Sequence, residues 1–302
     1  LGMFKEFAER AGLDIPTSLP LGFDCAGEVL NVGSNVKNLK PGDQVFGATM
    51  GSLRSHVITP EVFTVKKPQH LTYAQAAAIP TVFLTVYYGL KRLAGIKAGD
   101  KVLIHACAGG VGLAALQIAQ HAGAEVYATA SPGKWEFLKA MGVKHVLNSR
   151  NMDFADQIRE LTDGHGVDLV LNSINGECIP KSLELLAPNG RFVEIGKIDV
   201  WSPERIAEVR SDVQYFLFDL TETLVNDPQL LGSLMEEVAA DYTAGKLQPL
   251  PLQTFPMSDV AAGFRHLAQA RNIGKVVITN NDDIVQPAIA IHADRSYLIT
   301  GG

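Results

Sequence analysis

The chain has 302 residues, of which 47% are hydrophobic and 19% charged, so it can bury a sizeable core and is not a disordered chain. Its length predicts one large domain or two linked domains. The net charge of −6 argues against nucleic acid or an anionic membrane surface as the main partner.

The first 80 residues predict a small β-rich domain, because short apolar runs alternate with glycine and proline. The expected strands are CAGEVLNVG at 25–33, DQVFGA at 43–48, SHVITP at 55–60 and TVKKP at 64–68.

From Lys101 onward, apolar strands and amphipathic helices alternate. Expected strands lie at 102–106, 125–130, 145–149, 167–173, 190–196 and 213–220, and expected helices at 111–123, 134–141, 154–161 and 178–186. Apolar strands separated by helices form a parallel sheet that is covered on both faces. This region therefore predicts an α/β fold.

The remaining segments complete the predicted organisation into two domains. Helices are expected at Leu230–Tyr242 and Val260–Ala270, followed by a strand at 274–279 that returns to the first domain. This organisation assigns 1–82 and 225–290 to a β-rich substrate-binding domain, 83–224 to an NADP-binding domain, and 291–302 to a linker and the start of a following domain. The ending SYLITGG, at 296–302, reads as a strand that enters a glycine-rich phosphate turn.

Cysteine usage and the N-terminal sequence predict a cytoplasmic location. Cys25, Cys107 and Cys178 are too few and too scattered for a disulfide framework. The first 12 residues carry charges where a signal peptide needs an apolar stretch. The most apolar window, 102–119, contains His105 and Gln117, so no membrane span is expected.

The strongest chemical signal is the small-residue segment that follows the strand at 102–106 and opens a helix. It consists of Cys107, Ala108, Gly109, Gly110, Val111 and Gly112. The dinucleotide fingerprint G-x-G-x-x-G maps onto it with cysteine in place of the first glycine, and small residues let backbone N–H groups approach a pyrophosphate. The segment predicts dinucleotide binding; the alternative is a tight turn between strand and helix.

The end of the second strand favours NADP(H) over NAD. An NAD site places an acidic residue there to hold the ribose 2′-hydroxyl. This chain instead has Ser131 and Lys134, and Arg150 follows the third strand. A hydroxyl and two cations suit a 2′-phosphate, although both cations could also be ordinary solvated charges.

Several segments resemble the enoyl reductase domain of modular polyketide synthases, which belongs to the zinc-free branch of the medium-chain dehydrogenase/reductases. The similar blocks are LGFDCAGEV, PGDQVFGA, AAAIPTVFLTVYYGL, VLIHACAGGVGLAALQIAQ, VLNSINGE, GRFVEIGKID, YFLFDL and RHLAQARNIGKVVIT. The resemblance runs from Leu1 to about Thr279, and YLITGG is similar to the opening strand of a ketoreductase domain. The family's first substrate-domain strands are expected to precede Leu1, together with a tyrosine proton donor of some members.

The resemblance implies a Rossmann-type doubly wound parallel sheet and a GroES-like β-rich domain. It also implies the NADPH-dependent reduction of an α,β-unsaturated thioester on the phosphopantetheine arm of an acyl carrier protein. The partners it implies are that carrier protein and a ketoreductase domain in the same chain, with no nucleic acid and no membrane.

The family's zinc-dependent relatives provide a test for a metal. At 21–28, Phe23 stands where a histidine ligand would be, and the clustered cysteines of a structural zinc site are missing. The sequence therefore predicts no metal. Without a Lewis acid, reduction of a polarised double bond is favoured over oxidation of a simple alcohol.

By resemblance, Lys197 and Asp219 occupy positions that the family uses near the substrate Cα. Lys197 is the expected proton donor, with Asp219 orienting it. A lysine with its ordinary pKa of about 10.4 is a poor acid at neutral pH unless burial lowers that value. The alternative is an ion pair between domains.

Further positions carried over from the family are expected to face the coenzyme, and for each an architectural role is an open alternative. They are Thr81, Thr85, Asn172, Ser173, Gly196, Gly274 and Lys275.

Three other functions remain open at this point. The chain could reduce free quinones or enones, or bind a coenzyme as a scaffold without catalysis. It could also close a cyclopropane ring when a halogenated enoyl thioester loses halide after hydride addition.

Overall fold

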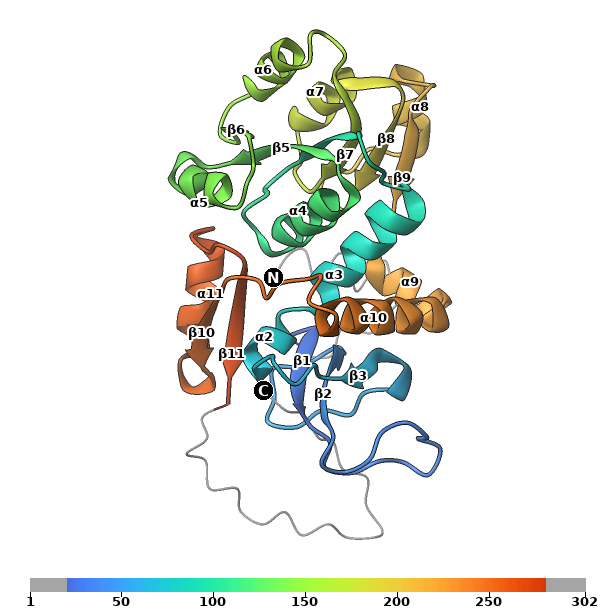
Figure 1. Ribbon diagram of the computed structural model, residues 1–302, viewed down its shortest axis with the longest axis vertical. Helices are drawn as coiled ribbons and strands as arrows, with labels where there is room; N and C mark the ends of the chain where they lie inside the picture. Colours follow the sequence, from blue (N-terminus) through green and yellow to red (C-terminus); the bar gives the residue numbers. More distant parts are fainter. Residues whose placement is uncertain (1–20, 281–302) are drawn as a thin grey trace. The chain divides into compact units, whose positions relative to one another are not determined.

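The computed structural model describes residues 21–280, and the chain separates into two compact units (Figure 1). Thr85–Thr223 form one, called here the sheet unit, and the chain up to Leu84 and from Leu224 forms the other, the split unit. The linker and following domain expected at 291–302 lie outside the described residues, as do the strands expected before Leu1.

The sheet unit is built on a six-stranded parallel sheet in the order β6-β5-β4-β7-β8-β9. The strands are β4 (Lys101–Ile104), β5 (Glu125–Ala130), β6 (His145–Asn148), β7 (Val167–Asn172), β8 (Leu186–Glu194) and β9 (Gln214–Leu217). The direction of winding reverses between β4 and β7. Ligands of such sheets bind at the carboxyl ends of the strands beside that reversal.

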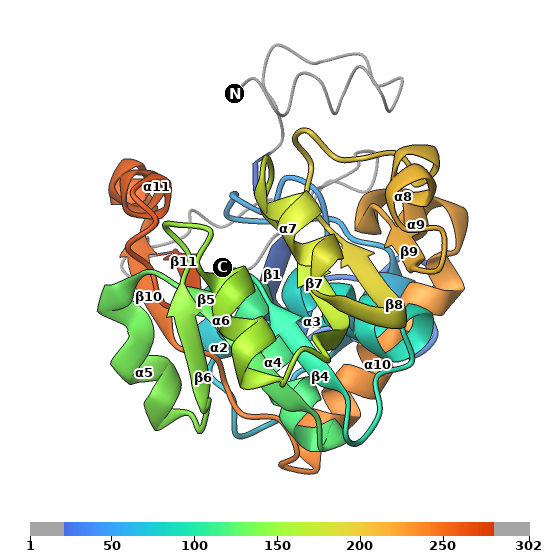
Figure 2. The ribbon, with the colours of Figure 1, turned by 90° about the horizontal axis from the view of Figure 1, so that it is seen from above.

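Helices cover both faces of this sheet. They are η2 (Tyr87–Leu93), α4 (Gly110–Ala122), η3 (Pro132–Lys134), α5 (Trp135–Ala140), α6 (Phe154–Leu161), α7 (Cys178–Glu184), α8 (Pro203–Val209) and α9 (Leu220–Asn226), the last of which crosses the unit boundary. Figures 1 and 2 place α4 and α5 on one side, and α6 and α7 on the other. The core between α6, α7 and the sheet includes the fully buried Leu103, Ile158 and Phe192.

The split unit contains a three-stranded antiparallel sheet, β1-β2-β3, and a parallel pair, β10-β11. Its elements are β1 (Asp24–Glu28), β2 (Gln44–Ala48), η1 (Glu61–Phe63), β3 (Thr64–Lys66), α2 (Tyr73–Ala77), α3 (Pro80–Val86), α10 (Pro228–Thr243), β10 (Leu252–Pro256), η4 (Met257–Asp259), α11 (Val260–Ala268) and β11 (Lys275–Thr279). The last two residues of α3 belong to the sheet unit. Phe83 packs edge-on against Tyr242 at 5.3 Å between ring centroids, so this α3 residue is a core residue. Among residues 21–280, no helix is long and apolar enough to cross a membrane.

One expected strand is wrong. Residues 55–60 form no strand, and Ile58 in this run is 56% exposed. Pro60, at the end of the run, lacks the amide proton that a strand ladder needs. The run therefore gains neither burial nor a complete set of backbone hydrogen bonds.

Candidate functional site

The small-residue segment forms a tight loop between β4 and α4. A Cβ on Gly112 would lie 2.5 Å from both Cα and the carbonyl oxygen of Cys107, so only glycine fits there. No side chain from the described part of the chain caps α4, whose N-cap is Gly109. Because unsatisfied N–H groups and the helix dipole favour an anion at this end, the loop fits a phosphate.

Cys107 serves this loop as a packing group. Its side chain is fully buried, and Sγ lies 3.9 Å from the carbonyl oxygen of Gly112. Burial raises the pKa of the thiol to about 12, so the thiol stays protonated. Ala108 is also buried, whereas Gly110 and Val111 are partly exposed at the start of α4.

Two cations lie near each other beyond β5 and β6. Ser131 directly follows β5, and its carbonyl oxygen accepts a hydrogen bond from the amide of Lys134 at 2.9 Å. Burial, and then the positive charge of Arg150, lower the pKa of Lys134. Two like charges that repel one another form a site that a phosphate dianion would stabilise.

Asn172 and Gly196 both donate hydrogen bonds to the carboxylate of Glu194, a residue that the sequence analysis did not single out. Asn172 Nδ2 donates to Glu194 Oε2, and the amide of Gly196 donates to Glu194 Oε1, both at 2.6 Å. Burial raises the pKa of Glu194, which these hydrogen bonds oppose. Among residues 21–280, Asn172 Oδ1 has no hydrogen-bond partner although it is buried, whereas the neighbouring Ser173 is exposed.

Lys197 and Asp219 form an ion pair beyond the carboxyl ends of β8 and β9. Lys197 Nζ lies 2.7 Å from Asp219 Oδ2. The other carboxylate oxygen, Oδ1, accepts a hydrogen bond from the amide of Thr221 at 2.7 Å, which fixes Asp219 at the start of α9. Burial raises the pKa of Asp219, but the hydrogen bond and the charge of Lys197 hold that pKa below its ordinary value.

In the split unit, two of the carried-over residues converge on Asp24, which sequence reasoning also missed. Its carboxylate accepts hydrogen bonds from the amide and the hydroxyl of Thr81, and it pairs with Lys275 Nζ at 2.8 Å. Gly274 has a φ of 71°, and a Cβ there would overlap the carbonyl oxygen of Pro251. Thr85 belongs to the sheet unit and is buried.

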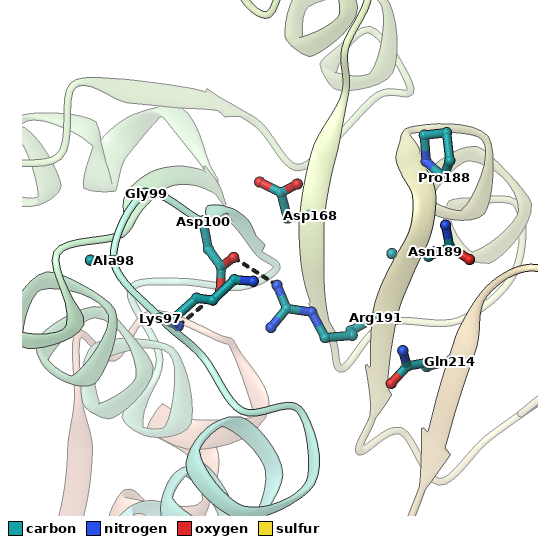
Figure 3. A pocket seen from close by; sticks show the side chains of 10 residues that line it. Lys97, Ala98, Gly99, Asp100, Asp168, Pro188, Asn189, Arg191 and Gln214 are labelled. Carbon is teal, nitrogen blue, oxygen red and sulfur yellow. Dashed lines mark hydrogen bonds and ion pairs between the residues drawn. The ribbon is translucent and has the colours of Figure 1, made fainter.

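A depression of about 490 Å³ lies at the opposite edge of the parallel sheet, where β4, β7, β8 and β9 begin (Figure 3). Its central ion pair joins Arg191 and Asp100 at 2.8 Å, and Asp100 also accepts the amide of Lys97. Arg191 further donates to the carbonyl oxygen of Ala94 at 2.8 Å. Because these charges already satisfy one another, the depression is structural and is not part of the candidate site.

Metal ligands do not gather in the described residues. Within 21–280, no three His, Cys, Asp or Glu side chains are grouped so that they could hold a metal ion. Phe23, at the position compared with a zinc ligand, precedes Asp24 of β1.

Family models match two parts of the chain. Residues 4–69 match the alcohol dehydrogenase GroES-like domain, and residues 141–278 match the zinc-binding dehydrogenase model. The crystal structure of the CurK enoyl reductase is 47% identical, with a TM-score of 0.85 over 92% of this chain and 84% of that one. The chain is an enoyl reductase domain of the polyketide synthase type. This membership confirms the predicted family and the predicted α/β fold class.

Two further proteins are similar to this enoyl reductase domain. The spectinabilin polyketide synthase system protein NorB of Streptomyces orinoci is 46% identical over 99% of the chain. The chain spans only 13% of NorB. The CurF ER cyclopropanase from the curacin A pathway is 42% identical, with a TM-score of 0.84 over 90% of this chain and 82% of that one.

Proposed function

We propose that this domain uses NADPH to reduce the α,β double bond of an enoyl thioester carried on an acyl carrier protein. The Lys197–Asp219 pair is the observation that carries the proposal. The pair lies beyond the carboxyl ends of β8 and β9, at the edge of the sheet where the loop 107–112 follows β4, and in this proposal Lys197 is the proton donor and Asp219 its fixed partner. Enoyl reductases of polyketide synthases are the relatives that support this activity.

The loop residues Gly109 to Gly112 would hold the pyrophosphate through backbone N–H groups. Ser131, Lys134 and Arg150 would hold the 2′-phosphate, which supports NADPH rather than NADH. Near the other end, Ser173 and Gly196 would contact the nicotinamide ring. Oδ1 of Asn172, which has no hydrogen-bond partner within residues 21–280, is an acceptor that a carboxamide could satisfy. When bound, NADPH supplies a hydride to Cβ of the substrate.

Lys197 then completes the reduction. Hydride addition leaves an enolate on the thioester, and the Lys197 ammonium donates a proton to Cα. Asp219 holds the ammonium in place through their ion pair at 2.7 Å. The balance is one hydride and one proton added across the double bond, and solvent returns the proton to the half-exposed lysine.

Thr81, Gly274 and Lys275 of the split unit, and Thr85 of the sheet unit, are also proposed to face the coenzyme. Asp24 fixes two of these side chains before any ligand binds. The carrier protein and a ketoreductase domain of the same chain are the proposed partners, supported by relatives that are much longer polyketide synthases. The cytoplasmic location stays a prediction.

A second reaction has its own support, because CurF is similar to this chain and is described as a cyclopropanase. With a halogen on Cγ, the enolate Cα would displace halide and close a three-membered ring. That step needs no proton at Cα, so Lys197 would be dispensable for it.

One assay tests these functions. The purified protein is mixed with NADPH and an enoyl thioester on a carrier protein, absorbance loss is followed, and the product is weighed by mass spectrometry. A product two hydrogens heavier supports the proposal. No NADPH oxidation supports a scaffold role, turnover of free quinones without turnover of thioesters supports a quinone reductase, and halide release from a halogenated substrate supports ring closure.

A further inference from the structure

A chain of hydrogen bonds runs beneath the phosphate loop, from Ala106 to helix α7. The amide of Ala106 donates to Thr129 Oγ1 at 3.3 Å, and this oxygen lies 3.0 Å from Nδ1 of His105. On the other side of the ring, Nε2 lies 2.8 Å from Ser182 Oγ, which donates to the carbonyl oxygen of Cys178 at 2.7 Å. His105 is only 2% exposed, and Thr129 and Ser182 are buried as well.

Burial lowers the pKa of His105 to about 3, so the ring is neutral, and a neutral ring satisfies these contacts with only one arrangement of protons. A carbonyl oxygen can only accept, so the single hydroxyl proton of Ser182 points to Cys178. Nε2 of His105 must therefore carry a proton and donate to Ser182. In the neutral ring, Nδ1 is then an acceptor, the hydroxyl of Thr129 donates to it, and a lone pair of Thr129 remains for the amide of Ala106.

This arrangement holds the loop in a conformation that its sequence does not favour. Ala106 has a φ of 49°, in the left-handed region where a Cβ approaches the following carbonyl oxygen. Thr129 binds the loop twice, because its backbone oxygen also accepts the amide of Cys107 at 3.0 Å. Without the hydroxyl, the amide of Ala106 would lose its acceptor and the strained conformation would lose its support.

One end of these hydrogen bonds reaches the proposed pyrophosphate loop, and the other reaches the helix that follows the segment proposed for the nicotinamide. Ala106 enters the pyrophosphate loop, and Ser182 lies in α7, the helix that follows Asn172 and Ser173. His105 packs between them, edge-on against Phe154 at 5.2 Å between ring centroids. A single imidazole thus connects the segment proposed for the phosphates with the helix that follows the segment proposed for the nicotinamide.

We infer that His105 is a positioning residue for the coenzyme: as the neutral Nε2–H tautomer it holds Ala106, through Thr129, in the conformation that binds the pyrophosphate. The effect on the coenzyme rests on the proposed function, whereas the hydrogen-bonded chain does not. A protein that loses this support populates the binding conformation less, and its apparent affinity falls in proportion.

The test uses Thr129→Val, which keeps the shape of the side chain and removes its hydroxyl, and Thr129→Ser, which restores the hydroxyl. Thr162→Val is the matched control. Thr162 is also buried, donates to Ile158, and accepts the amide of Gly166 at 2.9 Å, away from the loop. For each variant, NADPH affinity, KM and kcat are measured, together with amide hydrogen exchange of residues 105–112 in the coenzyme-free protein.

We expect Thr129→Val to weaken NADPH binding and raise its KM by about tenfold, with kcat within about twofold of wild type. Loop exchange should accelerate in the same variant. Thr129→Ser should restore wild-type NADPH affinity and wild-type loop exchange, and Thr162→Val should leave both the affinity and the exchange unchanged. Wild-type affinity together with wild-type loop exchange in Thr129→Val would overturn the inference.

A ¹⁵N spectrum of the histidine rings tests the tautomer directly in the coenzyme-free protein. A protonated Nε2 and an unprotonated Nδ1 are expected for His105, and the opposite tautomer would overturn the inference. If the wild-type protein failed to bind NADPH, the proposed function would fail, while exchange and the spectrum would still decide the role of the hydrogen-bonded chain.

Discussion

Lys197 and Asp219 form an ion pair of unequal partners: Nζ and Oδ2 are 2.7 Å apart, yet the lysine side chain is 50% exposed and the aspartate 18%. The aspartate is fixed by the amide of Thr221, whereas the lysine side chain reaches it from the loop after β8. A fixed carboxylate with an exposed cation suits a donor that must release a proton and recover it from water.

Lys197→Ala and Asp219→Asn should each slow enoyl reduction by about a hundredfold, the usual contribution of a positioned proton donor. NADPH affinity should stay near the wild-type value, because neither side chain is proposed to touch the coenzyme. Stopped-flow NADPH oxidation and a binding titration measure the two quantities. Lys246→Ala is the control, since its pair with Asp241 has a similar distance, 2.8 Å, and similar exposures of 64% and 18%. Unimpaired rates in both site variants would remove the pair from the mechanism.

Lys134→Ala should weaken NADPH binding by about 10- to 100-fold, the loss expected for a charge-assisted hydrogen bond. NADH, which lacks the 2′-phosphate, should bind within about threefold of wild type. Lys139→Ala serves as the control, because Lys139 pairs with Glu136 at 2.9 Å on the exposed face of α5. Equal weakening of both coenzymes by Lys134→Ala would contradict the phosphate role.

Gly112→Ala should destabilise the protein by about 1–3 kcal/mol and reduce coenzyme affinity more than about tenfold, because the added methyl group forces the loop backbone apart. Urea unfolding and an NADPH titration measure these effects. A Cβ on Gly33 would meet no atom within 4 Å, so Gly33→Ala should change neither quantity. A Gly112→Ala protein with wild-type affinity would show that the close approach to Cys107 is irrelevant to binding.

Acid should destabilise the protein partly through His105. Burial lowers the pKa of His105 to about 3, whereas an unfolded histidine has a pKa of about 6.5. Because the unfolded chain binds the proton first, this contribution is present above about pH 6.5 and is lost as the pH falls toward 3. Between about pH 7 and about pH 5, the stability advantage of wild type over His105→Gln should shrink by about 2 kcal/mol in urea unfolding.

The control for that experiment is His165→Gln, since the side chain of His165 is 53% exposed. At pH 7 its free energy of unfolding should stay within about 0.5 kcal/mol of wild type, as for most surface substitutions. Parallel curves for wild type and His105→Gln would contradict the assignment of the acid effect to His105.

Local patterns predicted the six strands of the sheet unit and its helices α4, α5, α6 and α7 closely, whereas η2, α8 and α9 were not predicted. The helix expected at 154–161 and the strand expected at 125–130 are observed with those bounds. The helix expected at 111–123 spans Gly110–Ala122, and its C-cap Gly123 adopts a left-handed φ of 76°. Hydrophobic periodicity and helix-ending residues lie within a few residues of the elements that they determine, so these elements can be predicted from local sequence alone.

Contacts that depend on strand register were not predicted. Asn172 and Glu194 are aligned partners of β7 and β8, 22 residues apart in sequence, and only the pairing of those strands brings them together. The strand β10 was missed because Pro251 and Pro256 interrupt its pattern, although its pairing with β11 stabilises it. Asp24 was missed for a similar reason, since Lys275 reaches it from the far end of the sequence.

The buried thiol of Cys107 can report the opening of the loop that contains it. A protonated thiol sealed beneath the first turn of α4 cannot react with an alkylating reagent while the loop is folded. The rate at which Cys107 becomes labelled therefore measures how often this segment opens, and a ligand that closes the segment will slow the labelling. Pulsed alkylation followed by peptide mass analysis would read out that opening in the natural sequence, without an engineered probe.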